Sequence, residues 1–178
     1  MAYKLGEVMI SREKIAGRIK ELAAEITKDF AQDNSVVLVG ILTGAAVFLT
    51  DLIREMPEDM DVRMDFMSVA SYGDSTESSG VVRIYHDLKQ SIEGKNVIVV
   101  EDIVDSGLTL SHLLDILKAR NPKSLKVCVL LDKYERRKTE VKVDYCGFKI
   151  PDEFVVGYGL DYASKWRHLK DIKSVVDE

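Results

Sequence analysis

Three carboxylates and a Ser-Gly-x-Thr sequence share one short stretch in the middle of the chain: Glu101, Asp102, Asp105, Ser106, Gly107, Leu108 and Thr109. The first two carboxylates are adjacent, and such a pair binds Mg²⁺ or the vicinal hydroxyls of a ribose. The serine, glycine and threonine offer hydroxyls and backbone N–H groups, which bind a phosphate at a helix N-terminus. Asp105 lies between the two halves and is placed to accept a proton or stabilise developing positive charge. The stretch therefore predicts a site for a sugar phosphate that carries a metal.

The residues on either side predict a strand before this stretch and a helix after it. Val97 to Val100 are four consecutive β-branched residues, which is typical of a strand buried on both faces. Leucines then recur at helical spacing from Leu108 to Leu117. In open α/β sheets, ligands bind where the carboxyl end of a strand meets the following helix. A solvated acidic turn, as in response-regulator receiver domains, is the alternative, but such a turn has no need of Ser-Gly-x-Thr.

The rest of the pattern predicts a single domain over residues 1–178, without linker or internal repeat. Ser11 is expected to cap a helix that ends near Asp33, and a second strand–turn–helix unit spans 36–56. Further strands are expected at 62–66, 81–88, 125–131, 141–150 and 154–160, and the tail at 164–176 is weakly helical.

The segment from Ser71 to Gly80 has one large side chain and two glycines, so it cannot bury enough surface to stay ordered alone. Composition alone favours a hairpin loop. Its position between two strands of an expected enzyme instead predicts a lid, which would exclude water from a reactive intermediate.

The composition narrows the classes of partner. A net charge of −5 and a pI near 5.3 argue against binding to nucleic acid or to an anionic membrane. No apolar run approaches the roughly 20 residues of a membrane-spanning helix. Cys128 and Cys146 lack metal-ligand spacing, and two separate thiols without a signal peptide predict a cytoplasmic protein.

Two acidic residues after an apolar strand, followed by Asp-Ser-Gly-x-Thr, resemble the 5-phosphoribosyl-1-diphosphate (PRPP) signature of the type I phosphoribosyltransferases. The resemblance extends over nearly the whole chain and narrows to the hypoxanthine-guanine phosphoribosyltransferases. It is carried by Leu42–Gly44, Ser71–Tyr72, Leu130–Lys133, Gly147–Tyr162 and Arg167. It implies the α/β type I phosphoribosyltransferase fold: a central, mainly parallel twisted sheet flanked by helices, a flexible lid loop, and a small purine-binding hood formed by the N-terminal segment and about 133–178.

The resemblance also assigns residues to the purine. Lys133 matches a lysine that donates to the oxygen at C6, which favours 6-oxopurines over adenine. Phe154 matches an aromatic residue that stacks on the base, and the backbone of Val155 is expected to read the base edge. Ile103 and Asp161 complete the expected purine contacts. Taken singly, a structural role is at least as consistent with each of Lys133, Phe154, Asp161 and Arg167; jointly, at the family spacing and behind an independent PRPP motif, these four residues favour the family's site.

The resemblance places the diphosphate against residues from three parts of the chain: Thr43, Gly44, Ser71, Tyr72 and Arg167. Mg²⁺ is the implied cofactor, held by Glu101 and Asp102, with a second ion at Asp161. Two positions depart from the family pattern, because Thr43 stands where many relatives carry Lys or Arg, and Leu108 where some carry Lys. The peptide before residue 43 is often cis in the family, so a cis bond is expected between Leu42 and Thr43.

The implied function is purine salvage. The 5-phosphoribosyl group of PRPP would pass to N9 of hypoxanthine or guanine, giving IMP or GMP plus diphosphate, while Asp105 takes the N7 proton. A transferase that prefers xanthine or another purine is an alternative. A non-catalytic PRPP-sensing regulator is a further one, although the chain is acidic and has no helix-turn-helix before its first strand. A homodimer or homotetramer is also implied.

Overall fold

The computed structural model describes residues 3–71 and 82–177, which form two sheets and three α-helices. The strands are β1 (Tyr3–Ile10), β2 (Ser35–Leu42), β3 (Asp61–Ser71), β4 (Val82–His86), β5 (Asn96–Val104), β6 (Ser124–Asp132), β7 (Tyr145–Lys149), β8 (Val155–Val156) and β9 (Ile172–Asp177). The helices are α1 (Arg12–Asp29), α2 (Ala45–Arg54), α3 (Leu108–Lys118) and the short 3₁₀ helix η1 (Tyr134–Arg136). Within these residues, no helix has the length and apolar character needed to cross a membrane.

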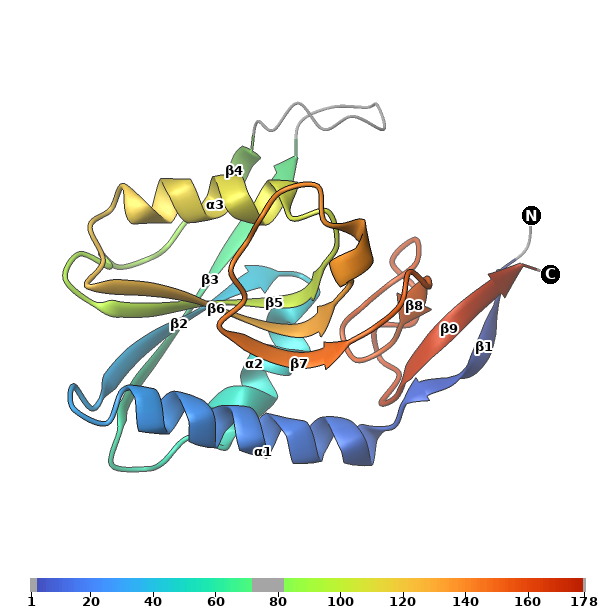
Figure 1. Cartoon of the computed structure of the whole chain (residues 1–178), viewed down its shortest axis with the longest axis horizontal. Coiled ribbons are helices and arrows are strands. Elements are labelled where there is room, and N and C mark those ends of the chain that lie inside the picture. Colours follow the sequence, from blue (N-terminus) through green and yellow to red (C-terminus); the bar gives the residue numbers. More distant parts are fainter. Residues whose placement is uncertain (1–2, 72–81, 178) are drawn as a thin grey trace.

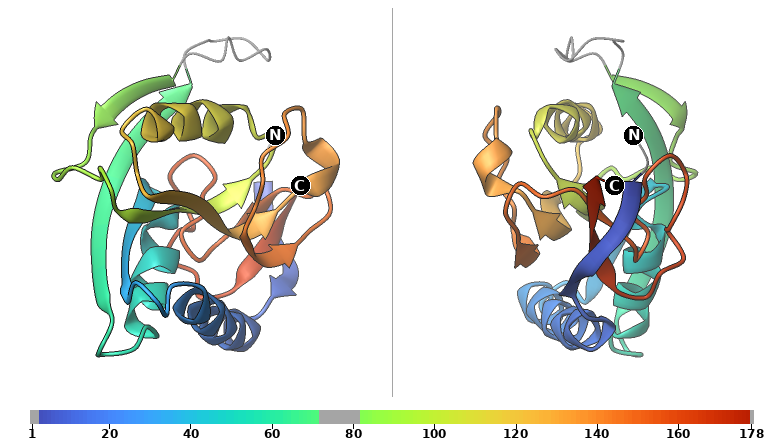
Figure 2. Two further views of the ribbon diagram at one scale, coloured as in Figure 1. Left: turned by 60° about the vertical axis from the view of Figure 1, so that its left-hand side comes forward. Right: turned by 90° about the vertical axis from the view of Figure 1, so that its right-hand side faces the viewer.

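The larger sheet has six strands in the order β4-β3-β2-β5-β6-β7. All its neighbouring strands are parallel except β3 and β4, so the predicted mainly parallel sheet is confirmed. Its central strands are apolar on both faces because helices cover both (Figures 1 and 2). Successive residues alternate between two cores: Leu38 and Ile98 pack with α1 and α2, whereas Val39 and Val99 pack with α3.

The smaller sheet joins the two ends of the described chain. Its order is β1-β9-β8, with antiparallel pairing of Tyr3 with Asp177 and of Ile10 with Ile172. β1 and β9 lie side by side at one end of the molecule, next to the carboxyl ends of the strands of the larger sheet (Figures 1 and 2). This sheet occupies the position expected for the hood.

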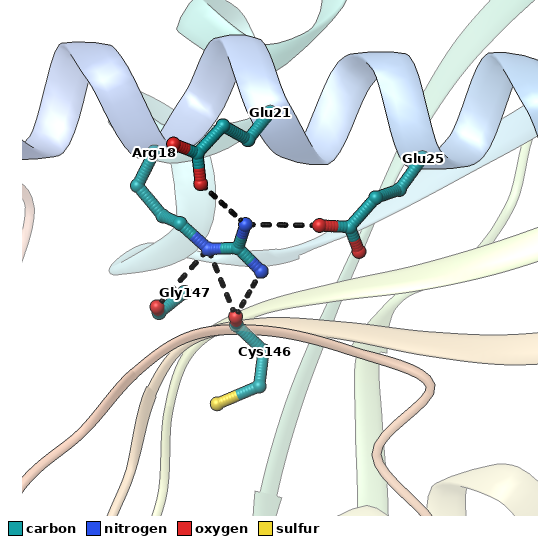
Figure 3. A network of polar contacts seen from close by, with 5 residues as sticks. All are labelled: Arg18, Glu21, Glu25, Cys146 and Gly147. Carbon is teal, nitrogen blue, oxygen red and sulfur yellow. Dashed lines mark hydrogen bonds and ion pairs between the residues drawn. The ribbon is translucent and has the colours of Figure 1, made fainter.

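Helix α1 begins at the predicted cap, where Ser11 Oγ accepts from the Lys14 N–H at 3.4 Å. The helix holds the edge strand β7 through Arg18 (Figure 3). Arg18 Nη2 donates to the Cys146 carbonyl at 2.9 Å, and Nε lies 3.3 Å from the carbonyls of both Cys146 and Gly147. Nη1 pairs with Glu21 at 2.7 Å and with Glu25 at 2.9 Å. One guanidinium therefore joins a helix to the free edge of the sheet.

Three sequence predictions about the C-terminal third are wrong in part. The tail at 164–176 is not helical: residues 164–171 form turns and bends, and Ile172–Asp177 form β9, whose β-branched residues pair with β1. The strand expected at 141–150 begins only at Tyr145, since the Asp144 carboxylate accepts the Val127 N–H at 2.9 Å that strand pairing would use. The strand expected at 154–160 ends at Val156, because Gly157 and Gly159 both have φ of 99°.

Candidate active site

The acidic stretch lies where β5 ends and α3 begins, as the sequence predicts. Gly107 precedes the helix with φ of 81°, a conformation that favours glycine. The parallel neighbours of β5 end at the same edge of the sheet, where Val104 pairs with Asp132 of β6. This edge is the ligand-binding edge of an open α/β sheet.

Glu101 and Asp102 form a desolvated pair of carboxylates. Burial, followed by repulsion from Asp102, raises the pKa of Glu101 well above its usual range. Burial also raises the pKa of Asp102, although the Ile103 N–H, which donates to Oδ1 at 2.9 Å, and the charge of Arg167 oppose this. Two adjacent, half-buried carboxylates gain from a bound cation, so these donors fit Mg²⁺. No group of three or more His, Cys, Asp or Glu side chains within 3–71 and 82–177 is arranged to hold a metal.

The loop after β2 packs directly on this carboxylate pair. The peptide between Leu42 and Thr43 is cis, as expected. A Cβ at Gly44 would lie 1.7 Å from Oδ2 of Asp102, so only glycine leaves room for the carboxylate. On the other side, a Cβ at Gly159 would lie 2.2 Å from the Gly44 carbonyl oxygen. Three segments far apart in sequence therefore converge at Gly44.

Arg167 also lies at the place where these three segments meet. Its Nη1 donates to the Gly159 carbonyl at 2.6 Å, and its Nη2 pairs with Asp161 Oδ1 at 2.6 Å. The other Asp161 oxygen accepts the Ser164 N–H at 2.7 Å. The guanidinium and the Asp161 carboxylate are therefore fixed in relation to each other beside the pair at 101–102.

The loop from Ser106 to Gly107 rests on the segment that follows η1. The Ser106 carbonyl accepts from the N–H groups of Lys138 at 3.0 Å and Thr139 at 3.2 Å. The Ser106 hydroxyl accepts the Leu108 N–H at 3.4 Å. A Cβ at Gly107 would lie 2.9 Å from the Thr139 carbonyl oxygen. The turn at 106–107 is thus supported by backbone hydrogen bonds, and its role as a phosphate cradle stays a prediction.

A continuous series of ion pairs connects Asp105 to Lys133. Arg136 Nε lies 3.0 Å from Oδ1 of Asp105, and its Nη1 lies 3.3 Å from Oδ1 of Asp152. The Lys133 ammonium, whose side chain is 7% exposed, lies 3.6 Å from the same Asp152 oxygen. The Lys133 N–H donates to the Val104 carbonyl at 3.0 Å, which fixes the lysine at the end of β6.

An exposed aromatic ring stands at the hood side. Phe154 is 51% exposed, whereas the next residue, Val155, is buried in β8. The Phe154 ring meets Tyr162 edge-on, with centroids 5.5 Å apart, and Tyr162 stacks on Trp166 at 6.2 Å. An exposed ring face held by aromatic neighbours is suited to stacking on a planar ligand.

A family model described as the phosphoribosyl transferase domain matches residues 9–163 of this chain. The chain belongs to this family. It is 48% identical over 169 residues to the hypoxanthine-guanine phosphoribosyltransferase of Bacillus subtilis, which covers 95% of this chain and 92% of the relative. It is 49% identical to the hypoxanthine phosphoribosyltransferase of Escherichia coli K12, over 96% of this chain and 95% of the relative.

Solved structures of the family agree with the fold. A hypoxanthine-guanine phosphoribosyltransferase from Bacillus anthracis has a TM-score of 0.91 at 47% identity, covering 99% of this chain and 100% of that chain. A hypoxanthine phosphoribosyltransferase from Staphylococcus aureus has a TM-score of 0.92 at 46% identity, covering 97% and 92%. The type I phosphoribosyltransferase fold predicted from the sequence is therefore confirmed.

The structure brings most of the predicted site residues of this family together at one edge of the sheet: Thr43, Gly44, Glu101, Asp102, Ile103, Asp105, Ser106, Gly107, Leu108, Thr109, Lys133, Asp161 and Arg167. Phe154 and Val155 follow on the hood. Ser71 is the last residue of β3, and Tyr72 with the predicted lid at 72–80 lies outside the described residues. The role of each of these residues stays a prediction.

Arg136, Arg137 and Asp152 are not among the site residues predicted from the sequence. The run at 135–138 predicts a charged, solvated loop, yet Arg137 is only 18% exposed and pairs with the buried Asp132 at 2.6 Å. Arg136 contacts Asp105, and Asp152 contacts Lys133. The available signal was the position of this charged run directly after a predicted purine-binding lysine.

Proposed function

We propose that this enzyme transfers the 5-phosphoribosyl group of PRPP to N9 of hypoxanthine or guanine, with release of diphosphate and formation of IMP or GMP. The observation that carries the proposal is the pair of groups at the purine edge. Lys133 is a buried cation and Asp105 is a carboxylate. The two are linked by ion pairs through Asp152 and Arg136. Oxygen 6 and nitrogen 7 are neighbours on a 6-oxopurine, and they need a donor and an acceptor side by side.

The sugar phosphate would lie over the junction of β5 and α3. Ser106, Gly107, Leu108 and Thr109 would hold the 5′-phosphate with hydroxyl and N–H donors at the helix N-terminus. Glu101 and Asp102 would orient the ribose hydroxyls. Because position 108 is leucine and carries no positive charge, the 5′-phosphate would be bound by neutral donors alone. This should lower the affinity for PRPP without changing the type of reaction.

The diphosphate would lie between the loop after β2 and the hood. The backbone of Thr43 and Gly44 and the planar guanidinium of Arg167 would contact its oxygens, and Ser71 and Tyr72 would close over it. Mg²⁺ held by Glu101 and Asp102, with a second ion at Asp161, would neutralise the charge of the leaving group. Arg167 must then exchange its contact with Asp161 for the diphosphate.

In the chemical step, the bond from ribose C1 to the diphosphate oxygen breaks, and a bond from purine N9 to C1 forms. Both electrons of the first bond leave with the diphosphate, and C1 develops oxocarbenium character as in glycoside cleavage. Asp105 would take the N7 proton, so that the purine ends neutral.

The purine would be selected by several groups at the hood. Phe154 would stack on the ring, the Val155 backbone would read its edge, and Lys133 would donate to the C6 oxygen. Ile103 and the backbone beside Asp161 would complete the pocket. We also propose a homodimer or homotetramer in the cytoplasm, which light scattering and cell fractionation would test.

The direct test is to mix the protein with PRPP and Mg²⁺, add hypoxanthine, guanine or xanthine, and follow ultraviolet absorbance. We expect turnover with hypoxanthine and guanine that stops when the metal is chelated. Turnover with xanthine alone would favour a related transferase, and PRPP binding without turnover would favour a sensor. Asp105→Asn should lower kcat by about 10² to 10⁴ and leave PRPP affinity nearly unchanged; an unchanged kcat would remove Asp105 from the mechanism.

A further inference from the structure

Two cations and two carboxylates alternate along the expected purine edge, and Arg136 is the member that touches the proposed proton acceptor. Its Nε lies 3.0 Å from Asp105 Oδ1, while its Nη1 lies 3.3 Å from Asp152 Oδ1. Asp152 belongs to the turn before β8, so it lies on the hood, and it also contacts Lys133 at 3.6 Å. Arg136 therefore bridges the floor of the site and the hood.

The contact between Arg136 and Asp105 is close but poorly aligned. Asp105 Oδ1 is shielded from solvent, yet it has no hydrogen-bond partner among the residues that the structure describes, even with the guanidinium nitrogen 3.0 Å away. A carboxylate oxygen that is shielded from water and lacks an aligned donor is destabilised. A well-directed hydrogen bond would remove most of that cost. This oxygen is therefore ready to exchange the arginine for a better-directed N–H.

A 6-oxopurine with hydrogen on N7 presents such a donor. Its oxygen 6 would face Lys133, which directs the adjacent N7–H toward Asp105. In the purine-free protein the Arg136 guanidinium lies against that oxygen without donating an aligned hydrogen bond to it. Because the oxygen is shielded from solvent, an N7–H that approaches it would have to take the place of the guanidinium.

We propose that Arg136 is a positioning residue that holds Asp105 in the purine-free enzyme and is displaced by the N7–H edge of the incoming purine. The inference rests on the proposed function, because it uses Asp105 as the acceptor of the N7 proton. Arg136 keeps its contact with Asp152 when it leaves Asp105, so the displaced guanidinium remains paired on the hood. The displacement also removes a positive charge from Asp105 before that carboxylate accepts a proton, a step that the charge would oppose.

The expected effect is modest, because the pair is half exposed: Arg136 is 50% and Asp105 is 44% exposed. Exposed ion pairs of this kind change equilibria by about twofold to fivefold. Arg136→Gln should therefore lower the KM for hypoxanthine by about twofold to fivefold at saturating PRPP and Mg²⁺. The KM for PRPP should not change, and kcat should change less than KM, since Arg136 has left Asp105 before the chemical step.

The matched control is Arg63→Gln. Arg63 is 53% exposed and pairs with Asp61 at 2.9 Å, in β3 and away from the purine edge, so its loss should leave both KM values unchanged. Arg136→Lys retains a cation beside Asp105 and should keep the KM for hypoxanthine close to that of the unsubstituted enzyme. A double-mutant cycle supplies the decisive comparison: in an Asp105→Asn background, measured at higher enzyme concentration, Arg136→Gln should no longer alter the KM for hypoxanthine.

The inference is overturned if Arg136→Gln leaves the KM for hypoxanthine unchanged or raises it, or if its effect persists in the Asp105→Asn background. These results are distinguishable from failure of the proposed function. If Asp105→Asn slows turnover and Arg136→Gln is silent, only the displacement of Arg136 is excluded. If Asp105→Asn turns over at the normal rate, the assignment of the proton acceptor fails and the inference fails with it.

Discussion

Gly44→Ala tests whether the loop after β2 and the carboxylate of Asp102 form one site. The new Cβ would lie 1.7 Å from Asp102 Oδ2 and 2.5 Å from its Cγ, whereas real Cβ contacts stay above 3.0 Å. The loop has little freedom to retreat, since a Cβ on Gly159 would already lie 2.2 Å from the Gly44 carbonyl oxygen. The Asp102 carboxylate must therefore move by more than about 1 Å.

This displacement of the Asp102 carboxylate should lower the rate of the reaction. The Asp102 carboxylate would lose its 2.9 Å hydrogen bond from the Ile103 N–H, and it would leave the position in which we propose that it binds the ribose and the metal. Misplacement of a positioning group by about 1 Å lowers rates by about 10²-fold. We therefore expect kcat/KM for PRPP to fall by about 10²-fold, measured by initial rates at saturating purine.

The matched control is Gly17→Ala, the same change within α1, where nothing lies within 4 Å of the new Cβ. Alanine inside an exposed helix should stabilise the protein by about 0.5–1 kcal/mol and leave the kinetics unchanged. A Gly44→Ala enzyme whose kcat/KM for PRPP stays within threefold of normal would refute the assignment of this loop and Asp102 to one binding site.

Three further predictions follow from the same structure. Lys133→Ala should raise the KM for hypoxanthine by about tenfold or more and leave PRPP binding intact, because it removes a charged donor; equal losses for both ligands would contradict its role. The raised pKa of Glu101 means that the folded, metal-free protein keeps a proton that the unfolded chain releases near pH 4.5, so stability should fall as pH rises above that value. Glu101→Gln should reduce this slope in thermal melts at several pH values and raise Tm at pH 8, with a smaller slope left by the raised pKa of Asp102; a slope that the substitution leaves unchanged would exclude Glu101 as its source. Arg18→Met should cost about 2 kcal/mol in urea unfolding, with Glu21→Gln nearly neutral, because only the first leaves the β7 carbonyls without their donor; equal effects would show that the surface pairs dominate.

The central junction is predictable from the sequence because its determinants are local. Four β-branched residues at 97–100 specify a buried strand, and leucines at helical spacing after Gly107 specify the helix. The turn between them then lies at a known edge of an α/β sheet. Other site residues, such as Arg167, were predicted only from the family resemblance. The position of Arg167 beside Asp161 depends on tertiary contacts, which the spacing of apolar residues in the sequence does not reveal.

The parts that sequence reasoning did not predict depend on distant partners. β9 has too few residues to specify its own structure, and it becomes a strand because β1 lies beside it. The shortened β7 depends on one side chain, Asp144, that takes the Val127 N–H. The contact of Arg136 with Asp105 joins two loops, and a run of charges does not reveal which of its members folds inward.

The pairing of β1 with β9 also orders events during synthesis. The first strand leaves the ribosome long before Ile172–Asp177 has been translated, so it must wait without its partner while β2, β5 and β6 already have theirs. The nascent chain can thus assemble the six-stranded sheet before the smaller sheet. A chain that ends between β8 and β9 would therefore contain the six-stranded sheet but leave β1 as an unpaired edge strand, which is prone to pair with other chains.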